Sequence, residues 1–260
     1  MNNLFLEGPV QTGKSTLIRE MLQEFYGANA CRSGSCNFEF CSAPDKVIGG
    51  FTVQRMHFPT PGENKRIGFR LMPASAPIKA HTCVTATDED LLASEGVFKL
   101  MSGSGKSPGS SQCGSRVKLE VFETLGVQYI RQAIEDYRTG RISLVLLDEI
   151  GGHEMICVEF RQALYEILES DIPCIGVVKL QESARGMLRK HLADATGNGA
   201  SARAQAILSY NLELHEKITG LDGEHGEIVY YDRADKQLAE SARSRIHQFL
   251  LRFPLPVPAP

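Results

Sequence analysis

A run of eight residues near the start of the chain limits the possible folds more than any other feature of the sequence. The run reads Gly8-Pro9-Val10-Gln11-Thr12-Gly13-Lys14-Ser15 and matches the pattern G-x-x-x-x-G-K-[ST] at every fixed position. A short apolar stretch, residues 4–6, precedes it, and residues 16–26 carry apolar side chains at helical spacing. A strand, a glycine-containing loop and a helix are the context that this pattern requires. The sequence therefore predicts a phosphate-binding loop (a Walker A motif) at the start of an α/β domain.

The residue types of this loop suit a nucleotide phosphate and a magnesium ion. Gly8 and Gly13 let the backbone turn tightly and point its N–H groups inward, and the helix that follows adds its positive end. Lys14 supplies a cation for the β- and γ-phosphates, and the Ser15 hydroxyl is a hard oxygen ligand for Mg2+. We expect the nucleotide to be bound by Gly8, Pro9, Val10, Gln11, Thr12, Gly13, Lys14, Ser15 and Thr16.

A second motif follows the apolar run ISLVLLD at residues 142–148. A continuous run of this kind is typical of a strand buried on both faces, and it ends in the acidic pair Asp148-Glu149. After a phosphate loop, such a pair predicts a Walker B motif, in which Asp148 holds Mg2+ directly or through water and Glu149 polarises the attacking water. The predicted metal ligands are thus Ser15 and Asp148, and the predicted catalytic residues are Glu149 and Lys14. Two solvated acids at an ordinary strand end are the alternative interpretation.

The remaining periodic segments alternate between strands and helices. The predicted elements are a hairpin from residues 47–57 and 65–72, a short helix within 88–101, helices at 124–137 and 237–251, and strands at 173–178 and 227–231. Alternation of strands and helices implies right-handed parallel crossovers. We therefore expect an α/β fold with a mostly parallel sheet and helices on both of its faces.

The predicted domain spans residues 1–252 and is followed by a proline-rich tail, residues 253–260. Inserted loops are expected at about 27–46, 74–116 and 182–218, the last of them helix-prone and broken at Gly197-Asn198-Gly199. The first loop carries Cys31, Cys36 and Cys41. Their spacing is wider than that of a zinc knuckle, so free thiols are the favoured interpretation and a metal or cluster site is the alternative.

Composition excludes several other classes of protein. The chain has 260 residues and a formal net charge of −3, which provides no overall basic field for nucleic acid. No apolar run approaches the ~20 residues of a membrane span, so we expect no membrane partner. Seven cysteines without an export signal predict reduced thiols in a cytoplasm. A protein partner is possible in principle, but no feature of the sequence indicates one.

Five segments together resemble the small P-loop nucleoside-triphosphatases, typified by the human cancer-related nucleoside-triphosphatase and its relatives in thermophilic microbes. The segments read GPVQTGKSTLI, GGFTVQR, RIGF, LLDEIG with Glu154 after it, and IPCIGVVK, in this order along the chain. The resemblance implies a single three-layer, RecA-like α/β domain. It also implies Mg2+-dependent hydrolysis of the terminal phosphate of ATP, GTP and other nucleoside triphosphates, with little selectivity for the base.

The sequence departs from the pattern of this family at one informative point. Where the family usually reads D-E-I-G-K-M-E, this chain has Gly152 in place of the lysine and His153 in place of the methionine. Fast turnover would also require an arginine finger, for which Arg55, Arg66 and Arg116 are candidates. Two other functions stay open at this point: a nucleoside or nucleotide kinase, and a nucleotide-gated interaction module with slow hydrolysis.

Overall fold

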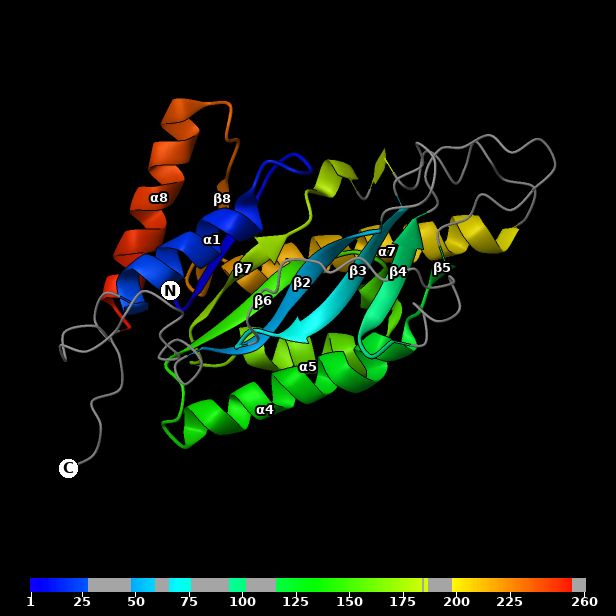
Figure 1. Cartoon of the computed structure of the whole chain (residues 1–260), viewed down its shortest axis with the longest axis horizontal. Helices are drawn as coiled ribbons and strands as arrows, with labels where there is room; N and C mark the ends of the chain where they lie inside the picture. Colours follow the sequence, from blue (N-terminus) through cyan, green and yellow to red (C-terminus); the bar gives the residue numbers. More distant parts are fainter. Residues whose placement is uncertain are drawn as a thin grey trace.

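An eight-stranded sheet forms the centre of the part of the chain that the structure describes. The computed structural model describes residues 1–27, 48–58, 66–75, 94–101, 116–183, 185–186 and 198–253 (Figure 1). The strands are β1 (Asn3–Glu7), β2 (Ile48–Phe58), β3 (Arg66–Pro73), β4 (Val97–Met101), β5 (Arg116–Val117), β6 (Leu144–Ile150), β7 (Cys174–Val178) and β8 (Gly226–Tyr230). The α-helices are α1 (Lys14–Leu22), α4 (Val127–Arg138), α5 (Val158–Leu168), α7 (Asn198–Thr219) and α8 (Lys236–Leu251). Short π- or 3-10 turns are η1 (Gln23–Gly27), η4 (Phe122–Gly126) and η5 (His153–Ile156).

The sheet has a parallel part and an antiparallel part. Its strand order is β5-β4-β3-β2-β6-β7-β1-β8. The strands from β2 to β8 in this order are parallel, while β3, β4 and β5 extend the β2 edge as an antiparallel meander. Because parallel strands end at the same edge, the residues after β1, β6 and β7 meet there, and this edge is where α/β sheets bind ligands.

Alternating side chains of the strands pack against helices on both faces of the sheet. Leu4 and Leu6 of β1 pack with α1 and α8, whereas Phe5 between them joins the core that includes α4, α5 and α7. Figure 1 shows α1 and α8 on one side of the sheet and α4 and α5 on the other. A buried aliphatic or aromatic side chain contributes roughly 1.5–3 kcal/mol, so the two cores hold this three-layer arrangement together. The predicted α/β fold is confirmed.

The structure corrects one sequence prediction of local structure and confirms another. Residues 97–101, included in a predicted short helix within 88–101, form strand β4, because Val97 and Phe98 pack beside β3 and the ladder with β3 overrides the helical spacing. Residues 198–219 form the long helix α7, as the helix-prone character of this segment predicted, and its side chains at Ala204, Ile207, Asn211, Leu214 and Ile218 are buried. The break predicted at Gly197-Asn198-Gly199 falls where this helix begins.

Other predictions fall partly outside the described residues. The three cysteines of residues 27–46, the Gly/Ser-rich part of residues 74–116 and all but the first residue of the tail lie there. The domain limits, and the idea that three segments are insertions, stay predictions. In the described part, no helix is both long enough and apolar enough to cross a membrane.

Candidate nucleotide-binding and hydrolysis site

The phosphate loop, residues 8–15, joins β1 to α1 in a conformation that depends on glycine. Gly8 has φ 144°, and a Cβ atom at this position would collide with the carbonyl oxygen of Tyr231, which follows β8. Gly13 has φ 88° and immediately precedes α1, while Gln11 adopts φ 66°. The predicted strand, loop and helix are therefore present, and the N-terminus of α1 faces the end of the loop.

The ammonium group of Lys14 lies inside this loop. Its Nζ donates to the carbonyl oxygens of Gly8 at 3.0 Å and Pro9 at 2.6 Å, and to Oγ1 of Thr12 at 3.4 Å. Burial lowers the pKa of Lys14, while the negative charges of Glu149, Asp148, Asp232 and Glu7 oppose that shift. The loop thus holds a partly desolvated cation beside the acidic pair that follows β6.

Asp148 is the point at which the phosphate loop meets the acidic motif. Its side chain is only 1% exposed. Oδ1 accepts a hydrogen bond from the hydroxyl of Ser15 at 2.6 Å. Oδ2 accepts from Thr52 Oγ1 at 3.0 Å, from the Val53 N–H at 3.1 Å and from Arg19 at 3.4 Å. Asp148 is therefore not a solvated acid, because groups from α1 and β2 use both of its oxygens.

Asp148 and Glu149 both lie within a β-bulge of β6. The register between β6 and β7 shifts between Leu147 and Ile150, so that β6 contains one residue more than its partner over this interval. Glu149 takes up the irregularity with φ 58°, a left-handed conformation that costs a non-glycine residue energy. The predicted strand end at residue 148 is therefore two residues early, since β6 continues to Ile150. Bulges beside functional sites redirect side chains in this way.

The carboxyl group of Glu149 lies in a mixed electrostatic environment. Burial raises its pKa, and the negative charges of Asp148 and Glu154 add to the effect. Lys179 opposes this rise in pKa more strongly than Lys14 does. Lys179 follows β7, the strand next to β6. The sequence therefore allowed its position at the carboxyl edge of the sheet to be predicted, although its role was not predicted.

Glu154 and Asn211 organise the segment that follows Glu149. Oε1 of Glu154 accepts from the Gly152 N–H at 2.6 Å, and Oε2 lies 3.4 Å from the ammonium of Lys179. Nδ2 of Asn211, on α7, donates to the carbonyl oxygens of Gly151 and Lys179, both at 3.1 Å. No feature of the sequence singles out Asn211, which is fully buried and brought here by the packing of α7.

Two further cations, Lys99 and Arg203, join Lys179 in the electrostatic environment of His153. Burial lowers the pKa of His153 to about 4, and Lys99, Lys179 and Arg203 act in the same direction while Glu154 opposes them. Lys99, on β4, has a pKa lowered by burial and by the charge of Lys179. The acidic residues beside the phosphate loop are thus countered by lysines from β4 and from the end of β7.

The three arginine candidates differ in what the structure shows of them. Nε of Arg55 is buried and has no hydrogen-bond partner among the described residues. The side chains of Arg66 and Arg116 lie outside the described residues.

Among the described residues, no group of three or more His, Cys, Asp or Glu side chains could hold a metal ion.

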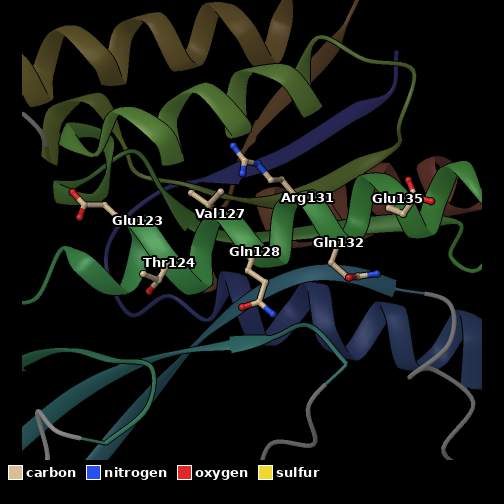
Figure 2. A pocket seen from close by; sticks show the side chains of 7 residues that line it. All are labelled: Glu123, Thr124, Val127, Gln128, Arg131, Gln132 and Glu135. Carbon is tan, nitrogen blue, oxygen red and sulfur yellow. The ribbon is translucent and has the colours of Figure 1, made fainter.

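A separate hollow of about 470 Å³ lies along η4 and α4 (Figure 2). It is lined by Glu123, Thr124, Val127, Gln128, Arg131, Gln132 and Glu135. None of the predicted site residues lines it, and α4 packs on the sheet face opposite to α1. The hollow is therefore distinct from the phosphate loop.

The loop after β1 and the acidic pair near the end of β6, with β7 between the two strands, define an α/β protein of the P-loop class. The hydrogen bond from Ser15 to Asp148 connects the two motifs although β7 lies between β1 and β6. The roles predicted for the individual site residues stay predictions, although the structure brings Lys14, Ser15, Asp148 and Glu149 together.

Comparison with known proteins identifies the family. A family model described as NTPase matches residues 3–197, and the chain belongs to this family of P-loop nucleoside-triphosphatases. It is 26% identical to nucleoside-triphosphatase THEP1 of Thermococcus kodakarensis over 67% of this chain and 74% of the relative. It is 34% identical to a protein of the same name from Methanosarcina acetivorans, over 32% of this chain and 42% of the relative. The crystal structure of THEP1 from Aquifex aeolicus covers 95% of this chain and 98% of its own, with a TM-score of 0.50 and 14% identity. The predicted family and the prediction of an NTPase are confirmed.

Proposed function

We propose that the chain hydrolyses the terminal phosphate of several nucleoside triphosphates, with the help of Mg2+ and with little selectivity for the base. The observation that carries the proposal is the 2.6 Å hydrogen bond from Ser15 to Asp148, which unites the phosphate loop with the acidic strand. Tolerance of the base is supported by the names of the relatives, which specify a nucleoside-triphosphatase and no particular base.

The donor atoms around Ser15 fit a magnesium ion. The Ser15 hydroxyl and the Asp148 carboxylate are hard oxygen ligands of the kind that Mg2+ prefers. Since Oδ2 of Asp148 already accepts from Thr52 and Val53, Ser15 is the better candidate for direct ligation, with Asp148 acting through Ser15 and through water. When bound, Mg2+ would offset the negative charge of the β- and γ-phosphate oxygens.

The remaining roles follow from the chemistry of each group. The backbone N–H groups of residues 8–15 would surround the phosphates, and Lys14 would exchange its contacts with Gly8 and Pro9 for contacts with phosphate oxygens. Glu149 would orient the water that attacks the γ-phosphorus. Burial raises the pKa of this carboxyl group, which makes it a better proton acceptor than an exposed glutamate.

The test is Glu149→Gln, which preserves the size of the side chain at a strained position. Under single turnover with ATP or GTP, we expect phosphate release to fall at least ~100-fold, while binding of a fluorescent nucleotide stays within a few-fold. Glu240→Gln, at an exposed position on α8, is the matched control and should change neither quantity. Unchanged phosphate release from the Glu149 variant would refute the role of Glu149.

A substrate panel tests the rest of the proposal. Phosphate release should be measured with ATP, GTP, CTP, UTP and the diphosphates, with and without Mg2+. We expect comparable rates for the four triphosphates and loss of activity when Mg2+ is removed with a chelator. A strong preference for one base would contradict the broad tolerance, and full activity without a divalent cation would contradict the metal requirement.

A further inference from the structure

Gly152 stands where the family pattern D-E-I-G-K-M-E has its lysine. The side chain of Lys179 fills the space beside Gly152. A Cβ atom built on Gly152 would collide with Nζ of Lys179 and would lie 3.1 Å from its Cδ. The same Cβ would lie 3.0 Å from Oε2 of Glu154. The end of the Lys179 side chain therefore lies where a side chain of residue 152 would begin.

The backbone of Lys179 is fixed to the acidic segment, residues 148–154, on two sides. Its N–H donates to the carbonyl oxygen of Ile150 at 2.8 Å, which continues the pairing of β6 and β7 past the bulge. Its carbonyl oxygen accepts from Asn211, whose Nδ2 also donates to Gly151. A side chain that starts from a backbone held in this way is suited to a positioning role, because little conformational freedom remains to be lost.

The ammonium group of Lys179 faces the acidic side chains of this segment. It lies 3.4 Å from Oε2 of buried Glu154, which belongs to the same segment as Glu149. Lys14 lies in the phosphate loop, where its Nζ donates to the carbonyl oxygen of Pro9. Two lysines from distant parts of the chain thus lie at this site, one in the phosphate loop and one beside the acidic segment that contains Glu149.

We infer that Lys179 is a positioning residue for phosphate hydrolysis: from the end of β7 it supplies the positive charge that a lysine at position 152 would supply from the acidic segment itself. The inference rests on the proposed function. It explains how the chain can lack a lysine at Gly152, because the space and the partner Glu154 are already taken by Lys179.

The first test compares Lys179→Met with Lys179→Arg. We expect Lys179→Met to lower kcat by about 10- to 100-fold while KM changes by less than about threefold, because the lost charge serves turnover more than nucleotide binding. Lys179→Arg keeps the charge and should retain kcat within about tenfold of the original chain. Lys236→Met, at an exposed position on α8, is the matched control.

The decisive test moves the lysine. Lys179→Ala removes the side chain that obstructs position 152, and adding Gly152→Lys then places a lysine there, where φ is −119° and not left-handed. We expect the double variant to recover at least about tenfold in kcat over Lys179→Ala alone. Failure to recover would overturn the inference, and so would a kcat of Lys179→Met within twofold of the original chain. Should the uncharged Lys179 variants not fold, the kcat of the double variant is compared with that of the original chain, and a value within about tenfold is expected.

A variant of Glu154, the ion-pair partner of Lys179, distinguishes a positioning role of Lys179 from a purely structural one. Removing Lys179 leaves Glu154 buried without its cation, so Lys179→Met is combined with Glu154→Gln, which keeps an acceptor for the Gly152 N–H. If neutralising Glu154 were the whole role, the double variant would regain full kcat, and the inference would be wrong; we expect kcat to stay low. An original chain that releases phosphate from no triphosphate would instead refute the proposed function, an outcome distinct from all of these.

Discussion

The phosphate loop and the acidic segment lie side by side at the carboxyl edge of the sheet, but they are held in place in opposite ways. In the loop, the polar contacts of Lys14 and Thr12 go to the loop itself: Lys14 to Gly8 and Pro9, and Thr12 to Pro9. In the acidic segment, Glu154 accepts from the Gly152 N–H within the segment itself, but the other side-chain contacts come from elements far away in the sequence. They come from Ser15 and Arg19 of α1, Thr52 of β2, Lys179 after β7 and Asn211 of α7.

This difference explains what each region is suited to do. A loop held by local contacts keeps its shape wherever a strand and a helix flank it, so it can bind phosphate in many proteins of this class. A segment held by long-range contacts depends on the packing of the whole domain, and its chemistry can change when one distant residue changes. We therefore expect variants in the loop to weaken nucleotide binding, and variants around the acidic segment to alter turnover and stability while binding persists.

The largest effect should follow from Lys14→Ala. The variant removes the cation from the loop, so nucleotide affinity and turnover should both fall, with kcat/KM reduced by ~100- to 1,000-fold. Measurement of Kd with a fluorescent nucleotide and of single-turnover phosphate release checks both quantities. Lys236→Ala on α8 controls for the loss of a surface lysine. If the Lys14 variant retained normal affinity and lost only turnover, the contrast between the two regions would be wrong.

The same contrast shows why the sequence predicted the loop and not its surroundings. The loop could be predicted because consecutive residues show the fixed spacing of Gly8, Gly13 and Lys14. The buried strand could be predicted from the apolar run before Asp148. The bulge at Glu149 arises from the pairing of β6 with β7, which no local pattern encodes. Val97 shows the same limitation, since a ladder with β3 decides its conformation.

An intermediate effect is expected from Asn211→Leu, which tests the long-range support of the acidic segment. The change leaves the carbonyl oxygens of Gly151 and Lys179 buried without this donor, at a cost of about 1–3 kcal/mol in the free energy of unfolding. Because both carbonyl groups belong to backbone next to the site, kcat should also fall by roughly tenfold with little change in KM. Urea unfolding and steady-state kinetics measure the two effects.

The neighbouring Leu212 offers a control for Asn211. It lies on the same helix and is 37% exposed, so Leu212→Ala should cost less than about 0.5 kcal/mol and leave kcat unchanged. Equal losses in the two variants would mean that general weakening of α7, rather than the two hydrogen bonds of Asn211, determines the result.

The smallest effect concerns His153, the residue in the methionine place of the resembled motif. Burial lowers its pKa to about 4, below the ordinary value of 6.5, so between pH 6.5 and 4 the unfolded chain binds a proton at His153 that the folded chain does not. Stability must then fall as the pH decreases through this window, and His153→Met should remove this component. We expect the loss of unfolding free energy between pH 7.5 and pH 5 to be smaller in the variant by about 1–2 kcal/mol.

Urea unfolding of both proteins at the two pH values measures this difference. His225→Gln is the control, because His225 is 44% exposed and no comparable effect is expected from it. A His153→Met variant that loses as much stability on acidification as the original chain would show that the imidazole is protonated at little cost in the folded state. The ring would then be less desolvated in the folded chain than its burial indicates.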